Sequence, residues 1–323
     1  MKDLLDLIIC RIPGLKTKER IELSMRFDME GDFTVLSKGD LEHIIGRELG
    51  EEPWDMHHYR SLAEKDDSRA RKMGIQCISW RDPSYPPLLR EIFDPPVLLF
   101  YRGHLSDPGQ PLVGMVGTRR PSAIGAARAY TLGRELGESG LPVVSGLALG
   151  IDALSHKGNL EGNGKTLAVL GSSPDMVYPT GNRFLARRIL ETGGCILSEY
   201  PPETGPFKWN FPERNRIISA LSRGLVVVEA PAKSGALITA AFALEHGRDL
   251  WVDQGVLDSP QSLGTKRLAE EGAKVISSAR DILREWNLPG IPTRECQDKD
   301  AGIEGASSKD LASSLAKQLD IKL

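Results

Sequence analysis

The sequence predicts an α/β protein in which a parallel sheet is flanked by helices, with a small helical domain before it. Two observations predict this class. From Leu112 onward, apolar runs alternate with glycine-rich or polar turns and amphipathic stretches. Continuous apolar runs separated by helices indicate strands that are buried on both faces, which is typical of parallel sheets. Before residue 74, apolar positions instead recur every three or four residues, the period of a helix.

The first 73 residues are predicted to form the small helical domain. Short connectors, such as Pro13-Gly14, separate its helices. Thr17 is a candidate N-cap, because its hydroxyl can accept a backbone hydrogen bond at a helix start. The helices are expected at residues 4–12, 17–27 and 37–49.

A larger domain is predicted for residues 74–286. It opens with two β-rich runs, at 75–80 and 97–103, between prolines that cannot continue a helix. The regular alternation of strands and helices follows these runs. Its strands are expected at residues 112–117, 141–147, 166–171, 195–200, 225–230, 249–254 and 273–277.

Residues 287–323 form a polar tail with weak periodicity. Its composition predicts a linker with at most one short helix and favours disorder in its first half, because few apolar side chains are available for burial. The 31 residues from position 293 onward are too few for a complete winged-helix domain. We therefore expect two folded domains and a tail.

The charge balance limits the kind of nucleic-acid contact that the chain can make. It carries 41 basic and 44 acidic side chains, a net charge of −3, with a pI of about 6.1. By position, the net charge is −3 for residues 1–80, +1 for 81–292 and −1 for 293–323. Domains with a broad basic face have a pI above about 9. The charge excludes such a face and leaves room for a local cationic site.

The cysteines and the apolar runs predict a cytoplasmic protein with no membrane partner. The cysteines are widely spaced and form no C-x-x-C pair, which argues against a zinc ribbon, a redox motif or a disulfide framework. They are Cys10, Cys77, Cys195 and Cys296. No apolar run approaches about 20 residues, and acids interrupt the first one, so neither a membrane helix nor a signal peptide is expected.

No cofactor, metal or catalytic residue is predicted. The six histidines form no H-E-x-x-H or Cys/His cluster, and neither a Walker A nor a complete G-x-G-x-x-G dinucleotide pattern occurs. Ser145, Asp152 and His156 could suggest a hydrolytic triad. However, Asp152 and His156 are four residues apart on one predicted helix, where they pair with each other, and no G-x-S-x-G elbow is present.

Candidate binding residues lie in the turns after the strands, because open α/β sheets bind ligands beyond the carboxyl ends of their strands. The first turn is Gly117-Thr118-Arg119. Its glycine lets a ligand approach the backbone, the following helix start offers free N–H groups, and Arg119 can hold a phosphate. The alternative is an ordinary turn with a solvated arginine.

Other turns carry small residues that suit backbone contacts with phosphate. Ser145-Gly146 lies near the end of the second strand run, at 141–147, and Ser234-Gly235 starts the helix after the run at 225–230. For the turn at 178–182, a structural turn capped by Asn182 is an equal alternative.

The most informative segment is residues 198–224, where positive charges alternate with aromatic rings. This pattern suits a single strand of nucleic acid, whose phosphates attract Lys and Arg while its unpaired bases stack on rings. The alternative is that the rings belong to the core and the arginines form surface salt bridges. The candidate residues are Lys208, Trp209, Phe211, Arg214, Asn215 and Arg216.

Eight motifs occur in an order that resembles one protein family. They are VGTRRPS, SGLALGIDALSH, YPTGN, SEYPP, FPERNRIISALS, VVVEA, SGALITA, and SPQSLGT before EGAKVI. Together they make residues 75–285 resemble the DNA-processing protein A family, the DprA or Smf recombination mediators. The resemblance implies an extended Rossmann-like domain, preceded by a helical domain of the SAM or helix-hairpin-helix type.

The resemblance also implies a function without enzymatic activity. Such a protein binds single-stranded DNA, protects incoming strands during natural transformation, helps to load a RecA-type recombinase, and forms a homodimer. By resemblance, Arg119 and Lys208 contact phosphates and Phe211 lies against a base. The residues implied to line the same pocket are Gly146, Arg214, Asn215, Ser234 and Gly235.

One difference from the family pattern concerns the pocket. Asp253-Gln254-Gly255 stands where the family usually has Pro-Gly, and we expect it to add a carboxylate near the pocket mouth. A second difference is the missing winged-helix domain that many members carry.

The alternative function is that of an enzyme of the nucleoside-monophosphate phosphoribohydrolase type. The motif of those enzymes resembles P-G-G-x-G-T-x-x-E. Here the stretch SGALITAAFALE has one glycine, and its first acid is Glu245.

Overall fold

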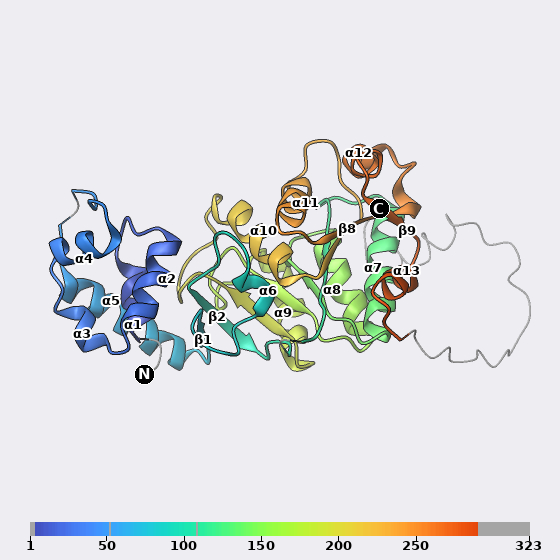
Figure 1. The fold of residues 1–323 in the computed structure, drawn as a ribbon. Helices are drawn as coiled ribbons and strands as arrows, with labels where there is room; N and C mark the ends of the chain where they lie inside the picture. The colour runs from blue at the N-terminus through green and yellow to red at the C-terminus, as the bar shows by residue number, and fades with distance from the viewer. Residues whose placement is uncertain (1–3, 52, 108, 290–323) are drawn as a thin grey trace, which may run out of the picture.

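Within the residues that the computed structural model describes, 4–51, 53–107 and 109–289, the chain folds around a nine-stranded sheet (Figure 1). The strands are β1 (Gln76–Ser79), β2 (Leu98–Gly103), β3 (Val113–Val116), β4 (Val143–Ser145), β5 (Leu167–Val169), β6 (Cys195–Ser198), β7 (Gly224–Val227), β8 (Asp249–Asp253) and β9 (Lys274–Ile276). Their order in the sheet is β1-β2-β6-β5-β4-β3-β7-β8-β9. The predicted α/β class is confirmed.

The order of the strands reverses at β3. On one side of β3 the sheet continues through β4, β5 and β6, and on the other side through β7, β8 and β9, all of them parallel. In open α/β sheets the ligand crevice lies beyond the carboxyl ends of the strands where this reversal occurs. The turns after β3, β4 and β7 border that crevice here.

One edge of the sheet departs from the expected parallel arrangement. β1 pairs with β2, and β2 pairs with β6, and both pairs are antiparallel. The strands β3 to β9 are therefore parallel to one another, whereas β1 and β2 each pair antiparallel with their neighbours. The β-rich composition of these runs predicted strands but carries no information on strand direction.

Helices follow the parallel strands and cover the sheet. They are α7 (Ala123–Glu138), α8 (Ile151–Glu161), α9 (Arg183–Glu191), α10 (Asn210–Leu221), α11 (Gly235–Glu245), α12 (Leu263–Glu270) and α13 (Ala279–Glu285). Successive strand residues point to opposite faces. Accordingly, Leu225 and Val227 of β7 pack in one apolar cluster while Val226 packs in another. Both faces are buried, as the continuous apolar runs predict.

Two of these helices touch at their backbones because glycines face the neighbouring helix. A Cβ added to Gly133 of α7 would lie 2.5 Å from the carbonyl oxygen of Ser155 in α8. Gly158 of α8 would likewise collide with the carbonyl of Tyr130 in α7. This contact fixes the helices that follow β3 and β4, and with them the turns that open toward the crevice.

Among the described residues up to position 72 there are five helices, at one end of the molecule in Figure 1. They are α1 (Leu4–Arg11), α2 (Thr17–Arg26), α3 (Glu30–Thr34), α4 (Lys38–Ile45) and α5 (Met56–Lys72). Two of them, α3 and α5, lie outside the three expected ranges. α5 buries Met56, Tyr59, Ala63 and Ala70, but most of its other residues are polar, so its apolar period is weak.

The N-terminal helices share a core with the edge of the sheet. Leu98 and Phe100 of β2 pack in the same apolar cluster as Leu4 and Ile8 of α1. The connection between β1 and β2 contains the short helix α6 (Pro87–Arg90). The helical module is therefore packed against β2.

The predicted tail lies mostly outside the described residues, which end at position 289. The expectations for residues 290–323, including Cys296, fall there. Over the ranges that are described, the helices are too short or too polar to cross a membrane.

Candidate functional site

The candidate site lies at the carboxyl ends of β3, β4, β5 and β7, and α10 connects its parts. At the start of α10, Asn210 Nδ2 donates to the carbonyl oxygen of Gly171, after β5, at 2.9 Å. One turn later, Asn215 Nδ2 donates to the carbonyl oxygen of Gly235, at the start of α11, at 3.4 Å. Arg214 reaches the ends of β4 and β5. One helix thus holds several turns in a fixed relation.

Arg214 connects α10 to the sheet through a buried charge. Only 4% of the residue is exposed. Its Nη1 donates to the carbonyl oxygen of Gly146 at 2.8 Å and to that of Val169. Burial lowers the pKa of Arg214 to about 10, and the neighbouring Asp152 opposes this shift. The side chain stays charged at neutral pH, but it is placed to hold helix and strands together rather than to meet a ligand from solvent.

Arg119 and Phe211, from two separate motifs, meet at the surface of the site. The guanidinium carbon of Arg119 lies 5.9 Å from the centre of the Phe211 ring, within cation–π range. Tyr178 packs against Phe211, with the two ring centres 5.7 Å apart. A Cβ on Gly171 would lie 3.0 Å from Phe211, so a small residue makes room for the ring. Arg119 is exposed and Phe211 is half-buried.

The loop before α10 adds an exposed cation between two exposed rings. Phe207 and Trp209 stack with their ring centres 5.0 Å apart and nearly parallel, and 65% of Trp209 is exposed. Lys208, between them in the chain, is also exposed. The alternative that Trp209 belongs to the core is therefore wrong.

Glu229 fixes the turn that carries Arg119, although the sequence analysis assigned it no role. Its carboxylate, which is fully buried, accepts hydrogen bonds from the amide and the hydroxyl of Ser122, both at 2.7 Å, and from the hydroxyl of Ser259 at 2.9 Å. Its carbonyl accepts from the amide of Thr118 at 2.7 Å. A Cβ on Gly117 would approach that carbonyl to 2.8 Å. The sequence signal for this role is an acidic residue directly after the apolar run of a strand.

The start of α11 is open to solvent. Ser234 caps the helix, because its hydroxyl accepts from the amide of Ala236 at 3.2 Å. Gly235 and the neighbouring Lys233 are exposed. Free amides at a helix start attract anions, so this turn can contribute to the same site through Asn215, which bonds to it.

Two predicted residues are placed elsewhere. Ser145 is fully buried, and its hydroxyl donates to the carbonyl oxygen of Met115 at 2.6 Å, within the sheet. Arg216 points away from Arg214 on α10 and forms ion pairs with Glu199 at 2.5 Å and Asp94 at 3.5 Å. Arg216 thus fits the salt-bridge alternative, since residues two apart on a helix face different sides.

From the sequence we expected Asp253 to place a carboxylate near the pocket mouth, but the structure does not show this. The residue is fully buried, and its carboxylate forms a two-point ion pair with Arg128 of α7, with Nη2 2.8 Å from Oδ2 and Nε 2.9 Å from Oδ1. It also accepts from the amide of Gly255 at 2.9 Å. The ion pair ties β8 to α7, so the Asp253 carboxylate is not free to face the site.

Two side chains of the possible triad, Ser145 and His156, have other partners. His156 Nδ1 bonds to the hydroxyl of Thr166 at 2.6 Å, and burial lowers the pKa of His156 to about 3. The Ser145 hydroxyl is engaged as described above. Across the described ranges, no three His, Cys, Asp or Glu side chains gather as a metal site would require.

The chain is similar in sequence to known proteins. A family model described as DNA recombination-mediator protein A matches residues 76–287. The DNA processing protein DprA of Bacillus subtilis is 42% identical over 229 residues, which cover 70% of this chain and 75% of the relative. The DprA of Streptococcus pneumoniae is 43% identical over 207 residues, covering 64% of this chain and 73% of the relative.

Two solved structures are similar as well. The X-ray structure of DprA from Streptococcus pneumoniae matches with a TM-score of 0.71 and 36% identity, covering 87% of this chain and 95% of that one. The structure of DNA processing protein A from Helicobacter pylori, reported for its single-stranded DNA binding mode, matches with a TM-score of 0.58 and 31% identity, covering 66% and 95%. These matches confirm the resemblance inferred from the motifs.

The contact between Gly146 and Arg214 predicts a large effect of a single methyl group. In Gly146→Ala the new Cβ would lie 2.6 Å from the Arg214 guanidinium, which cannot withdraw without breaking its buried hydrogen bonds. We expect a loss of about 1–3 kcal/mol in the free energy of unfolding, measured by urea denaturation. The matched control is Gly235→Ala, where a Cβ meets nothing within 4 Å; its change should stay within about 0.5 kcal/mol. Equal stabilities of the two variants would contradict the proposed packing.

Proposed function

Since the chain belongs to the DNA recombination-mediator protein A family, we propose that it is a single-stranded DNA-binding recombination mediator. The membership makes it a DNA-processing protein. The DNA site we propose consists of Arg119, Lys208, Phe211 and the start of α11 at Ser234-Gly235. The observation that carries the proposal is the meeting of Arg119 with the half-buried ring of Phe211 at the switch point of the sheet.

The chemistry of this site suits one flexible strand. Arg119 can pair with a phosphate while the ring of Phe211 receives a base, and such stacking tolerates any sequence because every base has a π-face. Lys208 is three residues from Phe211, so their Cα atoms are at most about 11 Å apart. A neighbouring phosphate is within reach. Phe207 and Trp209 offer a further exposed stacking surface.

The overall charge favours a single strand over a duplex. Residues 81–292 carry a net charge of only +1, so no long basic stripe is available to follow two phosphate backbones. A few cations in a crevice suffice for a strand that can bend into it.

The enzymatic alternative gains no support from the placement of Glu245. This acid is the last residue of α11, eleven residues after Ser234. At a rise of 1.5 Å per residue, it lies about 16 Å along the helix from the turn that would bind a phosphate. It lines a different cavity instead.

We extend the proposal to the role in the cell that the family resemblance implies: protection of incoming strands in natural transformation and loading of a RecA-type recombinase, by a homodimer in the cytoplasm. The chain should accelerate RecA filament assembly on oligonucleotides that are coated with single-strand-binding protein, and Arg119→Ala should accelerate it less. Fluorescence of labelled RecA follows the assembly. An unchanged rate with the wild-type chain would refute the loading role, and sedimentation equilibrium tests the dimer.

Salt titration tests the phosphate contacts. In fluorescence anisotropy with matched oligonucleotides, the chain should bind the single strand more tightly than the duplex. Arg119→Ala and Lys208→Ala should each weaken binding to all sequences and reduce the salt slope by about 0.7, the value for one phosphate contact on a single strand. The control is Arg71→Ala, an exposed arginine on α5, which should leave the slope unchanged. Equal affinity for single strand and duplex would refute the proposal.

Truncation of the ring tests base stacking. Phe211→Ala should cost about 1–3 kcal/mol of binding free energy for single-stranded DNA, because one stacked base loses its partner. Phe93→Ala is the matched control, since this ring is 74% exposed and lines another cavity. Anisotropy of a labelled oligonucleotide gives both values, and urea denaturation verifies that both variants are folded. The stacking role would be wrong if the two variants bound DNA equally well.

A further inference from the structure

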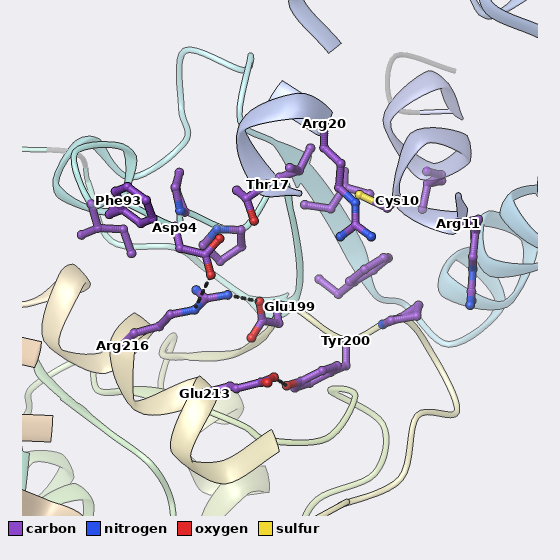
Figure 2. Close-up of a pocket in the computed structure, with 18 of the residues that line it drawn as sticks. Cys10, Arg11, Thr17, Arg20, Phe93, Asp94, Glu199, Tyr200, Glu213 and Arg216 are labelled. Atoms are coloured by element: carbon purple, nitrogen blue, oxygen red, sulfur yellow. Dashed lines mark hydrogen bonds and ion pairs between the residues drawn. The ribbon is translucent and has the colours of Figure 1, made fainter. Parts of the chain in front are cut away.

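A second cavity lies between the N-terminal helices and the α/β domain, away from the proposed DNA site. It has a volume of about 640 Å³, within the range of small-molecule sites. Its walls come from α1 and α2 on one side, and on the other from residues 92–98, the end of β6, α10 and α11 (Figure 2). Neither Arg119 nor Phe211 lines it.

The cavity holds one cation without a counter-ion. Arg11 pairs with Asp66, and Arg216 pairs with Glu199 and Asp94. Within the described part of the chain, Arg20 of α2 has no acidic partner, and its Nε is buried without a hydrogen bond. Figure 2 shows Arg20 reaching from α2 toward the side of the cavity that carries Glu199 and Tyr200. An anion at the Arg20 guanidinium, which lines the cavity, would supply the missing counter-charge.

Two buried polar atoms on the opposite wall have no hydrogen-bond partner among the described residues. Glu199 Oε1 and Arg216 Nη1 are buried and unpaired within the described residues, although the other atoms of both groups are engaged. A buried polar group without a partner costs free energy. Glu199 Oε1 needs a donor, and Arg216 Nη1 needs an acceptor. An unpaired cation and a carboxylate thus line the same cavity, which suits a ligand that carries both an anion and an N–H donor.

The lining as a whole disfavours a polymer of phosphates. Three arginines line the cavity, against five acids: Asp66, Asp94, Glu199, Glu213 and Glu245. Successive phosphates of a nucleic acid would be repelled by the acidic excess, whereas one phosphate can bind at Arg20. Inorganic phosphate alone would leave Glu199 Oε1 unpaired and most of the volume empty.

We propose that this cavity binds a nucleoside monophosphate whose base carries an amino group. The phosphate pairs with Arg20, and the exocyclic amine of the base donates to the Glu199 carboxylate, a contact that carboxylates make with amino-bearing bases. Tyr200 also lines the cavity, and its hydroxyl donates to Glu213 at 3.2 Å. The site is separate from the single-stranded DNA site and does not depend on it.

Calorimetric titration of the full chain tests the proposal with three probes. Adenosine monophosphate should bind saturably with a Kd of about 1 mM or tighter. Purine riboside 5′-monophosphate, which lacks only the amine, should bind at least about tenfold more weakly, and inorganic phosphate should also bind more weakly. Absence of saturable binding of adenosine monophosphate, or equal affinity for the two nucleotides, would overturn the proposal.

Variants locate the binding. Arg20→Ala and Glu199→Gln should each weaken binding of adenosine monophosphate at least about tenfold, because each removes a charged hydrogen-bond partner. The matched control is Arg26→Ala, an exposed arginine on the same helix outside the cavity, which should bind like the wild type. Arg119→Ala separates this site from the DNA site. If Arg119→Ala abolished nucleotide binding and Arg20→Ala did not, the nucleotide would occupy the DNA site and the proposal would be wrong.

Discussion

The buried guanidinium of Arg214 is the interaction on which the candidate site depends. Its bonds to the carbonyls of Gly146 and Val169 place α10 across the carboxyl ends of β4 and β5. That placement sets the position of Phe211, one turn earlier on the helix, and of Asn215, which contacts the start of α11. The buried charge is stable here because carbonyl oxygens accept its hydrogen bonds and the Asp152 carboxylate interacts with it favourably. A buried residue thus positions the exposed residues of the site.

Glu229 has the corresponding role on the other side of the switch point. It is buried after β7, and it binds the turn after β3 through Thr118 and Ser122. The Arg119 turn is thus held by a neighbouring strand rather than by its own sequence. Together, Arg214 and Glu229 pre-position the groups that we propose meet phosphate and base, so that less ordering is required when a strand binds.

α10 also serves two surfaces at once. Phe211 faces the crevice, whereas Glu213 and Arg216 line the cavity toward the N-terminal helices. Residues two apart on a helix point to different sides, which explains why a continuous basic and aromatic segment divides between two sites. Residues of α1 and β2 that pack together, such as Leu7 and Phe100, also line the cavity, so the helical module contributes a wall as well as a core.

Apolar periodicity by itself determined the fold class and the seven parallel strands, because burial on both faces leaves a continuous apolar run in the sequence. Motif order determined the family and located the turns near Arg119, Lys208 and Phe211. Strand direction at the β1–β2 edge and the polar helix α5 were decided by tertiary packing, which leaves no clear period in the sequence. The same holds for the paired Asp253 and for the separation of Arg216 from Arg214. Whether a charged residue faces a ligand or a buried partner depends on which distant segment packs against it, and that information exists only in the folded chain.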